Sequence, residues 1–123
     1  MSAVLDTGVL IDVLRGRQAA VEYLLGLPAT PVCSQVTRVE VLRGVRSGER
    51  TSTMRLLAGV DWHPVDSDVA DLAAKWGRTY RQSHPGLGVV DLCVAATADV
   101  LGLPLATINL RHFPMFPGLR APY

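Results

Sequence analysis

Three acidic residues of this chain stand out because apolar residues surround each of them. They are Asp6 in Val-Leu-Asp-Thr, Glu40 in Arg-Val-Glu-Val-Leu and Asp91 in Val-Val-Asp-Leu-Cys. The other eight of the 11 acidic residues, Asp12 among them, sit in polar settings and need no special role. Carboxylates that converge in a partly apolar cleft cannot all stay ionised unless pKa values rise or a cation binds. Oxygen-only ligands favour Mg²⁺ or Mn²⁺ over Zn²⁺, and such sites commonly hydrolyse phosphodiesters.

Each of these acids, taken alone, also has an ordinary structural explanation. Asp6 can cap the helix that is expected to follow it. Thr37 with Glu40 fits a capping box, in which the Glu side chain binds the backbone N–H of the cap residue. Asp91 near the start of a helix suits the positive end of the helix dipole. The sequence leaves these explanations open beside the hypothesis that the three acids together bind a metal ion.

An alternation of strand and helix patterns positions the three acids. Short apolar runs predict strands at residues 3–5, 31–36, 61–65 and 103–107. Helical spacing and stop signals predict helices at residues 7–15, 18–27, 37–47, 49–58, 67–83 and 90–101. This order predicts a single α/β domain over residues 1–123, with a short, mostly parallel sheet.

Two of the acids are expected to meet at one edge of that sheet. Asp6 and Glu40 each follow a predicted strand, near the start of the next helix. Because crossovers between parallel strands are right-handed, both fall at the edge where open α/β sheets bind ligands. No convincing strand precedes Asp91, so its place beside the other two is an inference that the pattern does not require.

Composition limits the classes of protein to which the chain can belong. The net charge of +1 makes the whole molecule a weak attractor for nucleic acid, so phosphate binding needs local clusters. Lys75 is the only lysine and the other 11 residues of the Lys and Arg set are arginine, which suits phosphate binding, although genomic base composition is the favoured explanation of the bias. Cys33 and Cys93 lie among apolar neighbours and are expected to be buried thiols. No apolar run is long enough to cross a bilayer and no leader is apparent, which predicts a cytoplasmic protein.

Four segments, in order, resemble the motifs of PIN domains, and the likeness is to the VapC toxins of bacterial toxin–antitoxin pairs. The opening segment is an apolar strand that ends in Asp6-Thr7, and the second carries Glu40 in Thr-Arg-Val-Glu-Val-Leu-Arg-Gly. In the third, Asp91 opens an Ala-rich helix. The closing segment, residues 105–113, has the pattern Thr-x-Asn-x-x-x-Phe. With the helices between them, the segments span nearly the whole chain.

The resemblance implies a PIN-like, doubly wound α/β/α sandwich and a Mg²⁺- or Mn²⁺-dependent endoribonuclease. It implies an RNA substrate, a cognate VapB-type antitoxin and a homodimer that pairs two active sites across a groove. Carried over by residue, Asp6, Glu40 and Asp91 become the metal-binding acids. Asn109 takes a fourth position, where many PIN nucleases have Asp, so the number of metal ions stays open. Thr7 becomes a partner that orients Asp6, or else a plain helix cap.

Some basic residues are candidates for RNA binding. Arg111 and His112 lie beside Asn109, on a loop that can contact phosphate or simply be exposed. Arg43 begins a basic stretch that continues through Arg46, Arg50 and Arg55. A solvated helix face explains that stretch as well as contact with RNA or with an acidic antitoxin segment.

Three alternative functions stay open. A PIN-fold binding module without catalysis is one, because Asn109 departs from the fully acidic pattern. A metal-dependent DNase is another, because acids do not distinguish RNA from DNA and contacts to the 2′-OH do. A phospho-acceptor signalling domain ranks last. That fold wants an acidic pair after the first strand and a late lysine, whereas Asp6 has no acidic neighbour and Lys75 lies in mid-chain.

Overall fold

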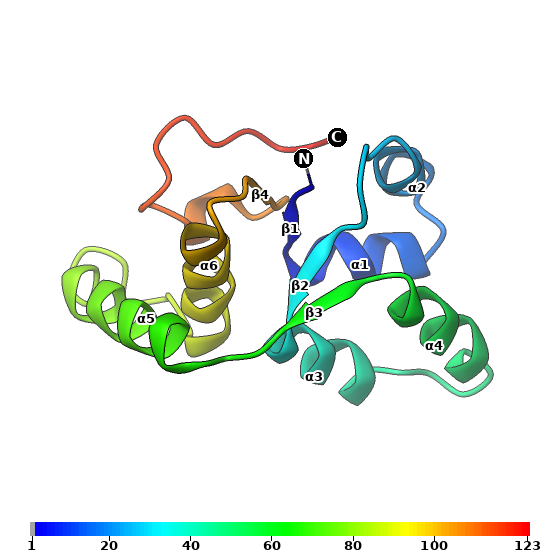
Figure 1. Ribbon diagram of the computed structural model, residues 1–123, viewed down its shortest axis with the longest axis horizontal. Coiled ribbons are helices and arrows are strands. Elements are labelled where there is room, and N and C mark those ends of the chain that lie inside the picture. The colour runs from blue at the N-terminus through cyan, green and yellow to red at the C-terminus, as the bar shows by residue number, and fades with distance from the viewer. Residues whose placement is uncertain (1) are drawn as a thin grey trace.

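The computed structural model describes residues 2–123 and shows one parallel sheet with helices on both of its faces (Figure 1). The strands are β1 (Val4–Leu5), β2 (Val32–Ser34), β3 (Asp61–His63) and β4 (Leu105–Ala106). The helices are α1 (Thr7–Leu14), α2 (Gln18–Leu25), α3 (Gln35–Arg43), α4 (Arg50–Ala58), α5 (Ser67–Thr79) and α6 (Val89–Leu101), followed by the 3₁₀ turn η1 (Leu110–His112). The predicted α/β class and parallel sheet are confirmed.

The order of the strands creates a switch point beside β1. The sheet runs β3-β2-β1-β4, and every pairing is parallel, with Val4 opposite both Val32 and Leu105. The chain therefore builds outward from β1 to β3 and then returns to add β4 on the other side of β1. Ligands of open α/β sheets bind outside the carboxyl ends of the strands at such a point.

Alternation along the short strands divides the core between the two faces. Val4 and Leu105 point to one side and pack with Val94, Ala95 and Ala98 of α6. Their neighbours in sequence, Leu5 and Ala106, point to the other side, toward apolar residues of α1 and α4. In Figure 1, α1, α2 and α4 lie to the right of the strands and α5 and α6 to the left, so the expected α/β/α sandwich is present.

The segment after β2 differs from its prediction. A strand is predicted over residues 31–36, yet β2 ends at Ser34 and α3 begins at Gln35. The cause is the Ser34 side chain, which caps α3 by accepting a hydrogen bond from the backbone N–H of Val36 at 3.2 Å. Val36 is thus the second residue of the helix. Its β-branched side chain favours a strand in the sequence pattern, which is why the predicted strand extends too far. The capping box of Thr37 and Glu40 is also wrong, because Glu40 lies in the middle of α3.

The other boundaries shift for local reasons. β3 stops before Pro64, which has no N–H for a ladder, and Asp66 then caps α5 by accepting from the N–H of Val69 at 3.0 Å. β4 ends at Ala106 because the next hydroxyl, on Thr107, accepts the N–H of Asn109 and turns the chain. Helix predictions at 18–27, 37–47 and 67–83 are too long, since those helices end at Leu25, Arg43 and Thr79.

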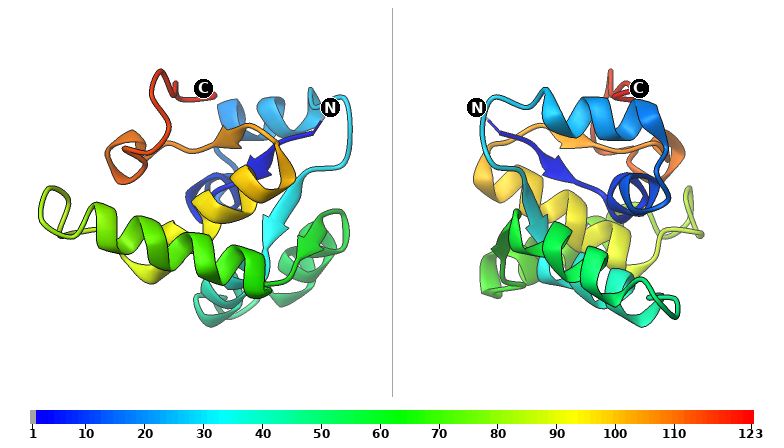
Figure 2. Two further views of the ribbon diagram at one scale, coloured as in Figure 1. Left: turned by 60° about the vertical axis from the view of Figure 1, so that its left-hand side comes forward. Right: turned by 90° about the vertical axis from the view of Figure 1, so that its right-hand side faces the viewer.

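Helix α6 is the central helix of its face, as its all-round apolar sequence predicts. Seven consecutive residues, from Leu92 to Ala98, are buried. Helix α5 runs beside it (Figure 2) and approaches it closely at Gly77, where a Cβ atom would lie 3.2 Å from the Leu92 side chain. Cys33 and Cys93 are buried free thiols, as expected. Within residues 2–123, no helix has the length and apolar character needed to cross a membrane.

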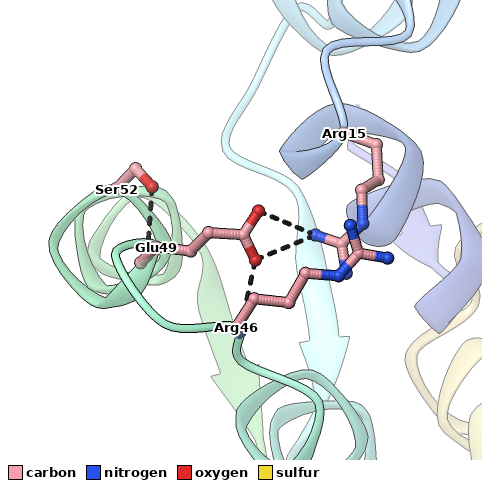
Figure 3. A network of polar contacts seen from close by, with 4 residues as sticks. All are labelled: Arg15, Arg46, Glu49 and Ser52. Atoms are coloured by element: carbon pink, nitrogen blue, oxygen red, sulfur yellow. Dashed lines mark hydrogen bonds and ion pairs between the residues drawn. The ribbon is translucent and has the colours of Figure 1, made fainter.

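A polar network on the opposite face fixes the start of α4 against α1 (Figure 3). Arg15 donates to both carboxylate oxygens of Glu49 at 3.3 Å, and the backbone N–H of Arg46 donates to the same carboxylate at 3.2 Å. Ser52 then donates to the backbone carbonyl of Glu49 at 3.0 Å. The loop within the predicted basic stretch is therefore held in place by an acid.

Phe113 anchors the segment that follows β4. Its ring is 1% exposed and packs with Val94 and Leu105, directly after the η1 turn. We expect Phe113→Ala to lower the free energy of unfolding by about 3–5 kcal/mol, because it leaves a large cavity in the core. Urea denaturation measures this. Leu25→Ala, at a site that is 79% exposed, should change the value by less than about 0.5 kcal/mol. Similar effects of the two changes would contradict this description of the core.

Candidate active site

The carboxyl ends of β1 and β4 open into a cavity of about 600 Å³. All four residues that were predicted to form the site, Asp6, Glu40, Asp91 and Asn109, line it. Asp6 and Asn109 follow the two strands of the switch point, whereas Glu40 comes from α3 and Asp91 from α6. The fold thus brings together three acids that are far apart in sequence.

Asp6 forms the floor of this cavity and is fixed at both carboxylate oxygens. The backbone N–H of Thr7 donates to Oδ1 at 2.8 Å, and the hydroxyl of Thr107 donates to Oδ2 at 2.7 Å. Asp6 is only 4% exposed. The capping explanation is therefore correct for α1, and the same carboxylate also faces the other acids.

Burial raises the pKa of Asp6 above its usual value, and this is the largest effect on it. The hydrogen bonds from Thr107 and Thr7 favour the ionised form and partly offset that rise. The negative charges of Asp91 and Glu40 then raise the pKa further. Asp6 is thus a carboxylate that a nearby cation would stabilise.

Glu40 is fixed from α1 across the cavity. The hydroxyl of Thr7 donates to Glu40 Oε1 at 2.7 Å, and the Thr37 hydroxyl oxygen lies 3.1 Å from that of Thr7. Thr7 was expected to orient Asp6, and it does so through its backbone N–H, while its hydroxyl serves Glu40. One residue therefore contacts two of the three acids.

Asp91 reaches the cavity without a strand in front of it. Gly88 precedes α6, and Asp91 lies in the first turn of that helix, so the helix-dipole explanation also holds. Packing of α6 against β1 and β2 brings this first turn to the edge of the sheet. His112 Nδ1 lies 3.3 Å from Asp91 Oδ2, which joins α6 to the loop after β4.

The residues expected to contact RNA occupy different places. His112 and Asn109 line both the acidic cavity and a neighbouring hollow. Arg111 lines that hollow and not the acidic cavity. Arg43 lines neither hollow, but its Nη2 lies 3.8 Å from Glu40 Oε2.

Two residues that contribute to the site were not identified from the sequence. Thr107 is fully buried and fixes Asp6; its place two residues before Asn109 in the closing motif was the available signal. Asp12 was assigned to a polar setting, yet it lines the cavity. Helical spacing offered a clue, since Gly8, four residues earlier on α1, lines the cavity too. The Asp12 carboxylate accepts from the Tyr123 hydroxyl at 2.6 Å and from Arg17 at 3.0 Å.

The donor groups of this cavity are those of a site for a hard cation. Its acids are carboxylates with an amide oxygen nearby, a set that suits Mg²⁺ or Mn²⁺. Among residues 2–123, no three His, Cys, Asp or Glu side chains are already grouped tightly enough to hold an ion by themselves. An ion here would keep water molecules in its shell, as Mg²⁺ usually does.

The sequence matches the family model described as PIN domain over residues 3–114. It is 40% identical to Ribonuclease VapC19 of Mycobacterium tuberculosis over 122 residues, which is 97% of this chain and 98% of that protein. It is 41% identical over 120 residues to Ribonuclease VapC10 of the same organism, which is 96% of this chain and 90% of that protein.

Solved structures agree with this match. The fold is similar to a chain of a toxin–antitoxin complex from Klebsiella pneumoniae, with a TM-score of 0.86, 29% identity and coverage of 99% and 98% of the two chains. It is also similar to VapBC-5 of Mycobacterium tuberculosis, with a TM-score of 0.66, 27% identity and coverage of 98% and 94%.

The raised pKa of Asp6 makes a prediction about stability without metal. The folded protein binds the Asp6 proton more tightly than the unfolded chain, whose value is near 3.8. Wild type should therefore lose stability as pH rises from that value through the raised pKa. Asp6→Asn avoids this loss, so in EDTA we expect it to be more stable than wild type at pH 7 and to lose that advantage near pH 4.

Urea denaturation at a series of pH values measures this difference. Asp61→Asn, which changes an exposed acid on β3, is the matched control and should change the stability at pH 7 by less than about 0.5 kcal/mol. An Asp6→Asn variant that is less stable than wild type at every pH would contradict the account, because the hydrogen bonds of Asp6 would then outweigh the cost of burying its charge.

Proposed function

Because the chain belongs to the PIN-domain family and, within it, to the VapC group, we propose that it is a metal-dependent endoribonuclease acting as the toxin of a toxin–antitoxin pair. The observation that carries the proposal is the convergence of Asp6, Glu40 and Asp91 on one cavity at the switch point of the sheet. The names of the relatives, Ribonuclease VapC19 and VapC10, support RNA as the substrate.

In this proposal Asp6, Glu40 and Asp91 hold a Mg²⁺ or Mn²⁺ ion, and Asn109 supplies a neutral oxygen beside them. A bound divalent ion would supply Lewis-acid chemistry, since it lowers the pKa of water and neutralises charge on a phosphate. One ion is the simplest assignment, because the amide of Asn109 adds no fourth negative charge.

The chain's own contribution is to keep the acids in position before any ligand arrives. Thr107 and the N–H of Thr7 fix both oxygens of Asp6, and the Thr7 hydroxyl fixes one oxygen of Glu40. Thr7 begins α1 and Thr107 directly follows β4, so both donors belong to the packed core of the domain. The carboxylates therefore need little rearrangement when a metal ion binds. Preorganised groups of this kind reduce the cost of stabilising a transition state.

His112 and Arg111 are proposed to bind the RNA backbone. His112 lines the cavity beside Asp91, and Arg111 lines the adjoining hollow, so one strand can pass both. Contacts of this kind position phosphates and carry no sequence information. The choice of RNA target therefore depends on other features of the substrate.

A VapB-type antitoxin and a second copy of the chain are the proposed protein partners. The structural relatives from Klebsiella pneumoniae and Mycobacterium tuberculosis are members of toxin–antitoxin complexes, which supports the first. The second rests on resemblance to VapC toxins, in which a homodimer pairs two active sites.

The function is tested by incubating cellular RNA with purified protein in Mg²⁺ or in EDTA. We expect wild type to cleave only with Mg²⁺. Asp91→Asn should lower the rate by more than about 100-fold, because loss of an outer partner of a metal ligand already costs about 10–100-fold. Asp99→Asn, an exposed acid on the same helix, is the matched control and should cleave as wild type does.

Other outcomes identify the alternatives. Cleavage of single-stranded DNA but not RNA would mean a DNase. A folded protein that binds Mn²⁺ and cleaves neither would mean a binding module. Equal cleavage by the Asp91→Asn and Asp99→Asn variants would remove Asp91 from the site.

A further inference from the structure

Three acids that line the cavity wall each lie beside one basic side chain. Arg17 donates to Asp12 at 3.0 Å, His112 lies 3.3 Å from Asp91, and Arg43 lies 3.8 Å from Glu40. Asp6, on the floor, is held by hydrogen bonds from Thr107 and Thr7. His112 lines the cavity itself, whereas Arg17 and Arg43 are largely exposed and each lies beside an acid that lines it.

The pair of Arg43 and Glu40 is the loosest of the three. Its atoms are 3.8 Å apart, beyond hydrogen-bond distance, and the Arg43 side chain is 75% exposed. Exposed ion pairs of this type contribute little free energy and are screened by salt. Arg43 can therefore leave Glu40 at small cost.

Glu40 does not have to move when Arg43 leaves. The Thr7 hydroxyl holds Oε1 at 2.7 Å, whereas Arg43 faces the other oxygen, Oε2. The carboxylate is therefore anchored through one oxygen and offers the other to whichever cation competes best for it.

The pair of Arg17 and Asp12 is held more firmly than the pair of Arg43 and Glu40. The Tyr123 hydroxyl donates to the same Asp12 oxygen as Arg17 does, and the Arg17 guanidinium lies 5.0 Å from the centre of the Tyr123 ring. Two partners, the Asp12 carboxylate and the Tyr123 ring, hold this arginine in place beside the cavity.

We propose that Arg43 exchanges partners: it pairs with Glu40 in the metal-free protein and with an RNA phosphate beside the cleavage site when a divalent cation occupies Glu40. This inference rests on the proposed function. The cation neutralises the charge of Glu40, so the attraction between Glu40 and Arg43 is lost. The cation also repels the positive charge of Arg43. A phosphate offers it a bidentate partner.

The exchange couples metal binding to RNA binding. Metal releases Arg43 for RNA, and RNA draws Arg43 away from a metal ligand, so each ligand raises the affinity for the other by the same factor. Arg43 also lies in the last turn of α3, where its charge suits the helix dipole. That structural role does not depend on metal, so a metal-dependent readout separates the two.

The test compares wild type with Arg43→Gln in two binding measurements. Mn²⁺ affinity without RNA is measured by electron paramagnetic resonance. Affinity for an RNA with 2′-O-methyl phosphorothioate linkages, which resists hydrolysis, is measured by fluorescence anisotropy in Mg²⁺ and in EDTA at constant ionic strength. Arg78→Gln, which removes an exposed arginine on α5, is the matched control for net charge.

We expect Arg43→Gln to bind Mn²⁺ about two- to fivefold more tightly than wild type, because an exposed ion pair no longer competes for Glu40. In EDTA its RNA affinity should fall less than it does in Mg²⁺, because without metal the phosphate has to displace Arg43 from Glu40 in wild type. In Mg²⁺ its RNA affinity should be weaker by about the same two- to fivefold. Arg78→Gln should match wild type in its Mn²⁺ affinity and in its response to Mg²⁺.

Three results would overturn the exchange. Equal weakening of RNA binding in Mg²⁺ and EDTA would make Arg43 a constant phosphate contact. No effect on either affinity, in a wild type that binds Mn²⁺ and cleaves RNA, would remove Arg43 from the site and leave the proposed function intact. Absence of Mn²⁺ binding by wild type would overturn the proposed function and the exchange together.

Discussion

The burial of the Asp6 carboxylate beside two other acids, at the carboxyl end of β1, is the constraint to which the rest of the site responds. Asp6 is almost completely buried, and its pKa is raised by burial and by the charges of Asp91 and Glu40. Capping of α1 does not require a charged residue at position 6, since Asn or Ser caps a helix about as well as Asp. The free energy stored in this cluster is what a cation can recover on binding.

The fold meets that constraint with neutral hydrogen-bond donors at Asp6 and with basic side chains beside the other acids. Thr107 and the Thr7 N–H hold Asp6, so the floor adds no internal cation that would compete with metal for that carboxylate. Arg43 lies near Glu40 but does not hydrogen-bond to it. Strand order β3-β2-β1-β4 makes this possible, because the switch point leaves the edge open above β1 and β4.

The sequence predicts an element correctly where a local run of apolar residues is enough to specify it. The apolar run before Asp6 predicted β1, and the apolar α6 was recognisable as a buried helix. The start of α3 was misplaced because Ser34, a cap, looks like any polar residue until its partner N–H is known. Thr107 and Asp12 depend on contacts across about a hundred residues, to Asp6 and Tyr123, which no local period encodes. For Asp91, resemblance to the family supplied a position that the strand pattern did not.

Diffraction from a crystal of the protein soaked in Mn²⁺, recorded at the manganese absorption edge, tests the central claim most directly. The account predicts an anomalous peak in the cavity, bonded to oxygens of Asp6, Glu40 or Asp91 and completed by water. It also predicts that the Thr7 hydroxyl keeps its hydrogen bond to Glu40. A saturated crystal whose manganese lies only outside this cavity would contradict it. Asp6 would then be explained as a helix cap, Asp91 as a charge that suits the helix dipole, and Glu40 as the hydrogen-bond partner of Thr7.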